Sequence, residues 1–394
     1  MTDPDLDQPG AHTAGESSSG HVRTLVLRAA DPTADRAAIE RAAALLRAGE
    51  LVAFPTETVY GLGADATRPE AAARVFAAKE RPLNDPLIVH LAHARDLPSV
   101  ARLDSALAAV VRILSARFWP GPLTLVLPRG DAIAPVVTAG GDTVGVRVPA
   151  HPVACALIDA AGVPVAAPSA NRFMHTSPTS ATHVLADLNG RIACILDGGP
   201  SSLGVESTVL DMTTKPPRLL RPGAVTLEAL RAVLGIVDPP ADAAPEPNAG
   251  HATSATAPDQ PPDDRSLKRA PGQFERHYAP RASLEVWDGD GPAAQSALLE
   301  RARSAIAAGE RVGALVPDDE AQALRESGAH VFALGPAGDL AAIARHLYAG
   351  LRDLDEQAVD RIVAHTFGQT GLGLAVRDRL RRAAGGRFVT EPHR

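Results

Sequence analysis

Two pairs of residues with the spacing i, i+2 could bind a nucleotide. The first pair is Lys79 and Arg81, which end a helical pattern and precede Pro82. The chain keeps a lysine here although its only others are Lys215 and Lys268, among many arginines. A compact ammonium beside a planar guanidinium suits a polyphosphate. Two cations at the end of a helix also complement its dipole, so a purely structural role stays open.

The second pair is Ser169 and Asn171, which follow an apolar run ending at Ala167. These hydrogen-bonding side chains could line a site, or they could be ordinary turn residues. Ser177 comes shortly after them, at the expected start of another helix. The free N–H groups of a helix N-terminus bind anions, so Ser177 could belong to such a site or could cap the helix.

Two arginines and a histidine lie in apolar strand patterns. Arg147 and Arg221 need an anionic partner there, which could be a carboxylate in a structural salt bridge or an anionic ligand. His90 ends the run PLIVH and could form a hydrogen-bonding wall of a pocket. His93 follows it closely, but the sequence supplies no further ligands with metal-site spacing. We therefore expect no metal site made by the protein alone.

The glycine-rich segments do not predict a nucleotide loop. GLGADA, which begins at Gly61, is similar to a dinucleotide fingerprint, but the acidic residue expected after a second strand is missing. Gly371 and Gly373 are compatible with a tight turn before the last helix as well as with a phosphate loop. No Walker A motif occurs in the chain. ATP, if the protein uses it, must be held by a different cradle.

The elements that would position these residues alternate between helices and strands. The helical patterns lie near 34–48, 69–79, 104–117, 152–161 and 179–188. The strand patterns between them are PLIVHL, LTLVLP, VGVRVP, VPVAAP, ACILDG and STVLDM. LVAFPTETVYGLG starts as a strand and ends in a loop. This alternation predicts a mixed α/β domain over residues 23–236.

The remaining regions differ in composition. Residues 1–22 are polar, have almost no apolar pattern and predict a disordered tail. Residues 237–281 contain a long stretch rich in proline, alanine and aspartate, which predicts a linker. In residues 282–394 the strands RVGALVP, HVFALG and RIVAHTF alternate with helical segments. We expect a small Rossmann-like parallel α/β domain there.

The composition is that of a folded protein of two domains. The chain has 394 residues, 45% of them hydrophobic, and a formal net charge of −7, so no basic field would hold a nucleic-acid backbone. Cys155 and Cys194 lie in apolar runs without zinc-like spacing, which favours a reducing compartment. No long apolar run occurs, and the N-terminus is unlike a signal peptide. These features predict a cytoplasmic location without a membrane span.

Nine motifs occur in a fixed order along the first domain: PTETVYGLG, KERP, PLIVH, FWPGPLT, VGVRVP, APSAN, SPT, GVEST and LLRPG. Together they strongly resemble the threonylcarbamoyl-AMP synthase family, whose catalytic domain is YrdC-like. APGQFERHYAP in the linker and the small domain after it are similar to the long, two-domain form of that family. Nine ordered motifs are far more specific than any one of them.

The resemblance implies a twisted mixed sheet around a positively charged cavity, and it assigns residues to two substrates. The positions that match threonine-binding residues are Thr58, His90, Arg147 and Ser207. The positions that match ATP-binding residues are Lys79, Arg81, Asp85, Thr143, Ala167, Ser169, Asn171, Ser177 and Arg221. Asp85 stands where the family often has asparagine. A carboxylate repels phosphates unless Mg²⁺ lies between them, so the role of Asp85 stays open.

The reaction that the resemblance implies joins L-threonine, bicarbonate or CO₂, and ATP. The threonine amine gives an N-carboxylate, which attacks the α-phosphorus of ATP and displaces pyrophosphate. Lys79 and Arg81 would be the catalytic cations, and Mg²⁺ would accompany ATP. The product, L-threonylcarbamoyladenylate, would pass to tRNA threonylcarbamoyl transferase proteins, which modify an adenosine in ANN-decoding tRNAs.

Two other functions are compatible with parts of the sequence. O-carbamoyltransferases of hydrogenase maturation share the YrdC-like domain but carry zinc-finger cysteines and an acylphosphatase domain, which this sequence lacks. An RNA-binding protein could use a basic concave surface, but the net charge and the 3% aromatic content argue against stable nucleic-acid binding.

The end of the linker carries a cluster of aromatic and cationic residues: Phe274, Arg276, His277 and Tyr278. A passive spacer has no need for such side chains. The cluster predicts a segment that closes the active site, with Tyr278 stacking or hydrogen-bonding at the nucleotide. The alternative is a simple hydrophobic anchor for the linker.

Overall fold

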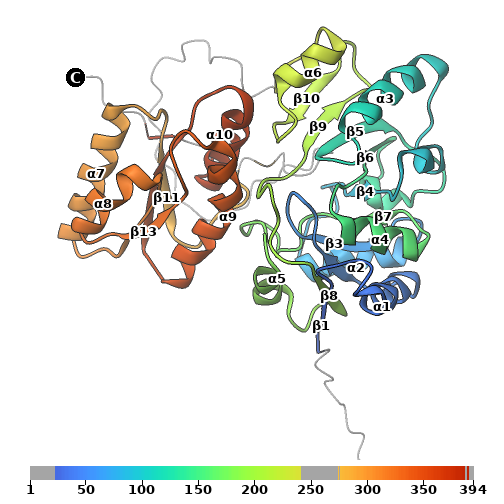
Figure 1. The fold of residues 1–394 in the computed structure, drawn as a ribbon, viewed down its shortest axis with the longest axis horizontal. Coiled ribbons are helices and arrows are strands. Elements are labelled where there is room, and N and C mark those ends of the chain that lie inside the picture. Colours follow the sequence, from blue (N-terminus) through green and yellow to red (C-terminus); the bar gives the residue numbers. More distant parts are fainter. Residues whose placement is uncertain (1–22, 241–273, 275, 387, 390–394) are drawn as a thin grey trace, which may run out of the picture.

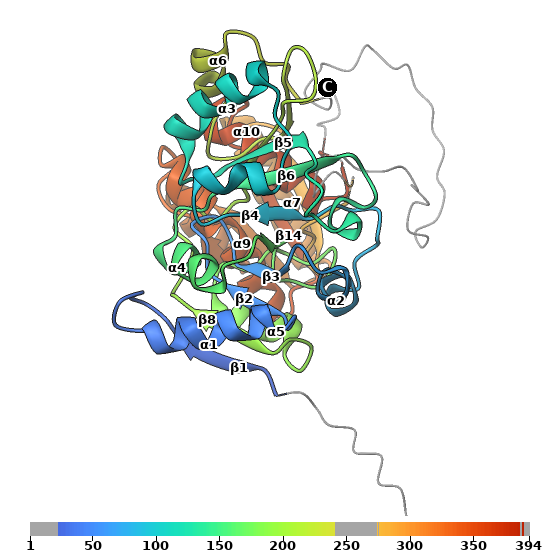
Figure 2. The same cartoon turned by 90° about the vertical axis from the view of Figure 1, so that its right-hand side faces the viewer.

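The first domain is built on one large mixed sheet. The computed structural model describes residues 23–240, 274, 276–386, 388 and 389. Ten strands form this sheet: β1 (Leu25–Arg28), β2 (Val52–Phe54), β3 (Gly61–Asp65), β4 (Ile88–His90), β5 (Leu123–Pro128), β6 (Thr143–Arg147), β7 (Val165–Ala166), β8 (Cys194–Asp197), β9 (Thr208–Asp211) and β10 (Arg218–Arg221). Their order is β1-β8-β2-β3-β7-β4-β6-β5-β9-β10, with parallel and antiparallel pairs. The side view runs along this order from β1 at the bottom to β5 near the top (Figure 2).

Helices cover both faces of this sheet. They are α1 (Arg36–Arg47), α2 (Pro69–Lys79), α3 (Ser105–Phe118), α4 (Pro152–Ala161), α5 (Ala181–Leu188) and α6 (Leu227–Leu234), with short 3₁₀ helices at Ala94–Ser99 and Pro135–Thr138. Phe54 of β2 belongs to the core under α1 and α4, whereas the preceding Ala53 belongs to the core under the other helices. Successive strand residues point to opposite faces, so one short strand supports both layers.

Strand β3 replaces a loop that we expected at the end of LVAFPTETVYGLG, so that part of the prediction was wrong. β3 pairs antiparallel with β2 and with β7. A Cβ atom at Gly63 would lie 2.9 Å from atoms of both Phe54 and Val165. Glycine is therefore required where the neighbouring side chains pack over the strand, and the GLGADA segment is part of the sheet.

The first candidate pair lies at the C-terminal end of helix α2. It begins at Pro69 and ends at Lys79, as predicted. Glu80 caps it in the left-handed conformation with φ 57°, so the chain turns sharply and Arg81 enters the loop before β4. The helix N-cap is Arg68, and the hydroxyl of the preceding Thr67 donates to Asp65.

The second domain is a four-stranded parallel sheet with the order β11-β14-β12-β13. Its strands are β11 (Ser283–Trp287), β12 (Val312–Val316), β13 (His330–Ala333) and β14 (Arg361–His365), and its helices are α7 (Pro292–Ala307), α8 (Asp318–Glu326), α9 (Leu340–Glu356) and α10 (Gly371–Ala383). The predicted fold class, a mixed-sheet domain followed by a small parallel α/β domain, is confirmed. β11 was missing from the strands we predicted.

The two domains share a hydrophobic core. Helices α9 and α10 lie on the side of the second domain that faces the first (Figure 1). Val59 and Val205 of the first domain pack in one cluster with Leu347 and Tyr348 of α9. At Gly204 a Cβ atom would lie 2.4 Å from the Cα of Arg345, so the two backbones are in direct contact.

Two of the predicted segments fall largely or wholly outside the described residues. The predicted tail (1–22) and most of the predicted linker (241–273) lie outside them. None of the helices within the described part of the chain has both the length and the apolar character that a membrane span requires.

Candidate active site

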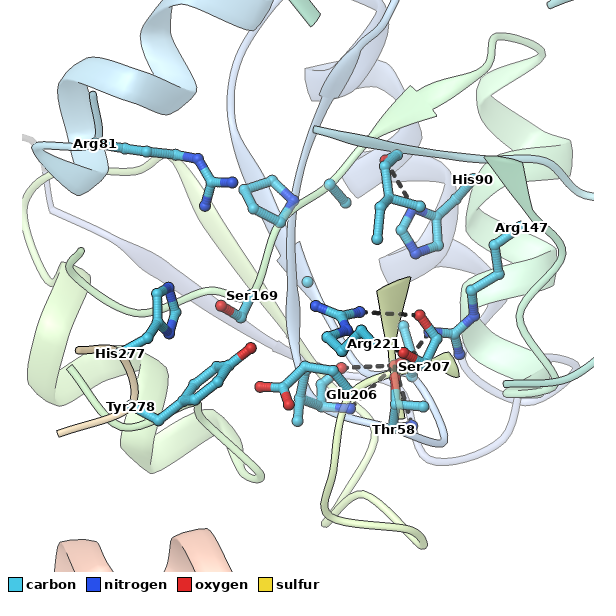
Figure 3. A pocket seen from close by; sticks show the side chains of 16 residues that line it. Thr58, Arg81, His90, Arg147, Ser169, Glu206, Ser207, Arg221, His277 and Tyr278 are labelled. Carbon is cyan, nitrogen blue, oxygen red and sulfur yellow. Dashed lines mark hydrogen bonds between the residues drawn. The ribbon is translucent and has the colours of Figure 1, made fainter. Parts of the chain in front are cut away.

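A cavity of about 510 Å³, which includes the space at its open mouth, lies between the first sheet and the segment before β11 (Figure 3). The predicted site residues that line it are Thr58, Arg81, His90, Arg147, Ala167, Ser169, Ser207, Arg221 and Tyr278. The predicted residues that do not line it are Lys79, Asp85, Thr143, Asn171 and Ser177. One cavity thus contains residues assigned to threonine together with residues assigned to ATP.

Lys79 and Asn171 support the segment that carries Ser169. The Lys79 ammonium donates to the carbonyl oxygens of Ser169 at 2.6 Å and Asn171 at 2.5 Å. The Asn171 amide donates to the carbonyl oxygens of Arg172 and His175, each at 2.7 Å. Burial and then the charge of Arg81 lower the pKa of Lys79 well below its ordinary value. Lys79 therefore acts on the cavity through the backbone of the SAN segment.

Asp85 is the buried partner of Arg81. Its carboxylate lies 2.8 Å from Nη2 of Arg81, and both side chains are almost fully buried. The guanidinium also donates to the carbonyl oxygens of Asp85 at 3.1 Å and Pro86 at 2.9 Å. These contacts fix the direction of a cation that faces the cavity. Asp85, whose role the sequence left open, thus orients Arg81 within this chain.

The threonine-assigned end of the cavity centres on Arg147 at the end of β6. Its guanidinium donates to the Thr58 hydroxyl at 2.9 Å and lies 2.6 Å from a carboxylate oxygen of Glu57. His90 lies beside it at the end of β4. Burial, together with the charge of Arg147, lowers the pKa of His90 to about 3, so the imidazole is neutral at physiological pH. Both roles proposed for Arg147 are therefore possible at once, because it has a carboxylate partner and still lines the cavity.

Thr143 begins the same strand, β6, and pairs with Pro128 of β5. Only the other end of β6 reaches the cavity.

Arg221 and Ser207 connect the two ends of the cavity. Arg221, assigned to ATP, donates to the backbone carbonyl of Ser207 at 3.0 Å and to its hydroxyl at 3.2 Å. The Ser207 hydroxyl also lies 2.8 Å from that of Thr124 on β5. A substitution of Arg221 or Ser207 would therefore disturb the position of the other residue.

Ser177 neither caps a helix nor lines the cavity. Helix α5 begins at Ala181, and Ser180 caps it by accepting from the N–H of His183. The Ser177 hydroxyl instead donates to Glu206 at 2.6 Å. Glu206, which we did not predict, lines the cavity next to Ser207.

The end of the linker forms one wall of the cavity. His277 and Tyr278 both line it, and the Tyr278 hydroxyl points into it near Ser169 (Figure 3). Tyr278 adopts a positive φ of 63°, which is uncommon for a residue with a side chain. The segment is held on both sides, since the N–H of Ala279 donates to Met174 and that of His277 to Arg382. Burial, followed by the charges of Arg81 and Lys79, lowers the pKa of His277 well below its ordinary value.

Both domains of this chain are similar to known proteins. A family model described as "Telomere recombination" matches residues 44–223, and a model of the threonylcarbamoyl-AMP synthase C-terminal domain matches residues 225–385. A threonylcarbamoyl-AMP synthase from Bacillus subtilis is 44% identical over 352 residues, covering 89% of this chain and 94% of that protein. This chain belongs to the threonylcarbamoyl-AMP synthase family.

Another member of the threonylcarbamoyl-AMP synthase family is similar to this chain in sequence and in structure over a comparable length. A threonylcarbamoyl-AMP synthase from Pyrococcus abyssi is 42% identical over 355 residues, covering 89% of this chain and 95% of that protein. The crystal structure of P. abyssi Sua5 complexed with L-threonine matches with a TM-score of 0.80 and 40% identity, over 93% of this chain and 98% of that chain. The family and the enzyme class predicted from the nine motifs are confirmed.

Three polar residues of the cavity region escaped prediction in this role. Glu57 lies in PTETVYGLG and Glu206 in GVEST, so both belong to motifs of the threonylcarbamoyl-AMP synthase family that we had recognised. A search of those motifs for every buried carboxylate would have found them. His277 was predicted only as part of a linker cluster.

Proposed function

We propose that this member of the threonylcarbamoyl-AMP synthase family forms L-threonylcarbamoyladenylate and pyrophosphate from L-threonine, bicarbonate or CO₂, and ATP. The observation that carries the proposal is the single cavity that unites Thr58, Arg147 and Ser207 with Arg81 and Ser169. Two substrates must meet in one reaction, and Arg221 contacts Ser207 where the two residue sets adjoin.

The reaction needs positioning and charge neutralisation rather than a covalent enzyme intermediate. The neutral threonine amine forms a bond to the carbon of CO₂ and loses a proton to water, which leaves an N-carboxylate. An oxygen of that carboxylate bonds to the α-phosphorus of ATP while the bond to the pyrophosphate oxygen breaks. Arg81 and Arg221 place positive charge beside the anionic groups, which lowers the cost of bringing them together.

Mg²⁺ would enter this cavity with ATP. No group of three or more His, Cys, Asp or Glu side chains that could hold a metal ion occurs among the described residues. Glu206, the carboxylate in the lining, already accepts hydrogen bonds from three side chains. This donor set fits an ion coordinated mainly by phosphates and water, which is the usual form of Mg²⁺ at nucleotide sites. Its chemical contribution would be to neutralise phosphate charge.

The His277–Tyr278 wall would protect the product. A mixed anhydride of a carbamate and a phosphate reacts with water, so exclusion of water from the cavity preserves it. Tyr278 is almost fully buried and its hydroxyl faces the nucleotide side of the cavity. We therefore assign the segment the closing role predicted for it. Delivery of the product to tRNA threonylcarbamoyl transferase proteins and a cytoplasmic location are parts of the same proposal.

The decisive experiment measures pyrophosphate release from ATP by the purified full chain. We expect release that depends on both L-threonine and bicarbonate, with an adenylate that carries a threonylcarbamoyl group detected by mass spectrometry. Release that is unaffected by leaving out threonine would reject the proposal. Carbamoyl phosphate is the matched alternative substrate, and turnover of it would indicate an O-carbamoyltransferase instead.

A further inference from the structure

Arg379 of the second domain inserts a buried cation into the catalytic domain. It lies on α10, and its side chain is entirely buried. Its guanidinium donates to the Glu206 carboxylate at 2.7 Å, to the Asp378 carboxylate at 2.6 Å and to the Pro222 carbonyl oxygen at 3.0 Å. A buried guanidinium is costly unless all its donors are satisfied, and here they join two loops of the other domain.

The two loops held by Arg379 carry residues of the cavity. Glu206 directly precedes Ser207, and Pro222 directly follows Arg221. Arg221 and Ser207 are themselves hydrogen-bonded, so Arg379 closes a ring of contacts around the point where the two substrate sets adjoin. The Arg379 guanidinium also lies 5.6 Å from the ring centre of Tyr278.

A second residue of the same domain holds the same carboxylate. The hydroxyl of Tyr348 on α9 is buried and donates to Glu206 at 2.9 Å. Ser177 fills the other oxygen of Glu206. Glu206 is the only carboxylate in the described lining of the cavity, and each of its oxygens has a donor.

We propose that Arg379 and Tyr348 are positioning residues for the reaction, which hold Glu206 and thereby fix Ser207 and Arg221 in the cavity. The inference rests on the proposed function, because its readout is that reaction. A shift of about 1 Å in such groups can cost on the order of 100-fold in rate.

The charges around Glu206 give the inference a pH signature. Burial alone would raise the pKa of Glu206, but the charges of Arg379 and Arg221 and the hydrogen bonds from Ser177 and Arg379 hold it below its ordinary value. The other titratable groups that face Glu206 are Tyr348 and Tyr278, whose hydroxyls stay protonated because burial raises the pKa of both. Without the Arg379 charge, Glu206 should bind a proton at higher pH.

The test compares Arg379→Gln and Tyr348→Phe with the parent in the full chain. Arg377→Gln is the matched control, because Arg377 lies on the same helix and pairs with Asp288 inside the second domain. For Arg379→Gln we expect kcat/KM for threonine-dependent pyrophosphate release to fall by about 10- to 100-fold. In a plot of kcat/KM against pH, the fall in activity on the acidic side (the acidic limb) should also move to higher pH in this variant. Arg377→Gln should follow the parent. Arg379→Lys, which keeps the charge, should restore the position of the acidic limb.

Two outcomes would overturn the inference. One is a folded Arg379→Gln variant with the parent's kcat/KM and acidic limb. If that variant fails to fold, Tyr348→Phe decides, because it removes only a hydroxyl; a parent-like pH profile and kcat/KM in this variant then reject the positioning role. An inactive parent enzyme would instead reject the proposed function, so the two failures are distinguishable.

Discussion

The charged side chains of the first domain's cavity differ in composition and pairing from those at the carboxyl edge of the second sheet. Three arginines, Arg81, Arg147 and Arg221, line the cavity, against the single carboxylate of Glu206. In the second domain the carboxyl ends of four parallel strands form the edge where α/β folds usually bind ligands. There Asp288 is paired with Arg377, and Glu320 with His365.

This difference separates an anion site from a structural edge. Arg81 and Arg147 are each oriented by a buried carboxylate outside the lining, Asp85 and Glu57, and still face the cavity, where they can attract an anionic ligand. Internal pairs at the sheet edge already satisfy the groups that would otherwise attract a ligand. A domain with a Rossmann-like sheet can thus serve as a support, and here its helices α9 and α10 reach the cavity from outside it.

Removal of Arg81 should have the largest effect on the cavity side of this comparison. We expect Arg81→Ala to reduce threonine-dependent pyrophosphate release by about 100-fold or more, because a cation aimed at transferred phosphate is lost. Asp85 would then keep a buried charge without this cation, so Arg81→Ala combined with Asp85→Asn separates catalysis from folding. Arg74→Ala is the control, since Arg74 pairs with Glu50 at the surface. Near-parent turnover by the folded double variant would contradict the anion-site assignment.

The sequence predicted residues of this cavity correctly where the local structure depends on residues close together in the chain. The turn after α2 and the SAN segment are short-range features, and both bring predicted residues to the site. Lysine scarcity led us to predict a phosphate-binding cation at Lys79; the structure instead shows its ammonium buried against the carbonyl oxygens of Ser169 and Asn171, and the phosphate contact stays a prediction. Every predicted contact with ATP or threonine stays a prediction, both for residues that line the cavity and for those outside it, such as Lys79 and Thr143.

What the sequence could not show depends on distant contacts. The donors to Glu206 are separated from it by 29, 142 and 173 residues in the chain. The residues around Arg379 in the sequence form no pattern that predicts a partner in another domain. Strand β3 was missed for a related reason, since its glycines are explained only by the strands packed against them.

Selectivity among amino acid substrates tests the assignment of the threonine end of the cavity. We expect threonine to exceed serine in kcat/KM by about 10- to 200-fold, because one methyl group in a pocket is worth about 1–3 kcal/mol. Alanine should perform worse than serine if His90 or a neighbour hydrogen-bonds the substrate hydroxyl. The measurement is pyrophosphate release at several concentrations of each amino acid. Equal kcat/KM for all three would show that Thr58, His90, Arg147 and Ser207 do not form a selective pocket.

Substitutions in the His277–Tyr278 wall should have a smaller effect on the reaction than the loss of Arg81. We expect Tyr278→Ala to weaken ATP binding by up to about tenfold, the usual worth of one aromatic contact. It should also lower the ratio of intact adenylate to free AMP, because water then enters the cavity. Tyr278→Phe keeps the ring and separates stacking from hydrogen bonding. Unchanged ATP affinity and product ratio in Tyr278→Ala would leave the segment as an anchor only.

The sheet edge of the second domain should affect stability and leave catalysis unchanged. Burial would lower the pKa of His365, but the hydrogen bond and charge of Glu320 raise it above its ordinary value. A raised pKa in the folded state means that the stabilisation is fully present below the unfolded value of about 6.5 and is lost as pH rises through the folded value. The free energy of unfolding of the second domain should therefore decline with pH above about 6.5 in the parent, and decline less in His365→Gln. Trp287 emission in a Trp119→Phe background reports on this domain, because the chain has two tryptophans, one in each domain. At neutral pH, His365→Gln should cost about 1–3 kcal/mol, since Glu320 loses a buried partner, while threonine-dependent pyrophosphate release stays at the parent level. A loss of turnover without a change in stability would mean that this edge does take part in the reaction, and the contrast between the two regions would fail.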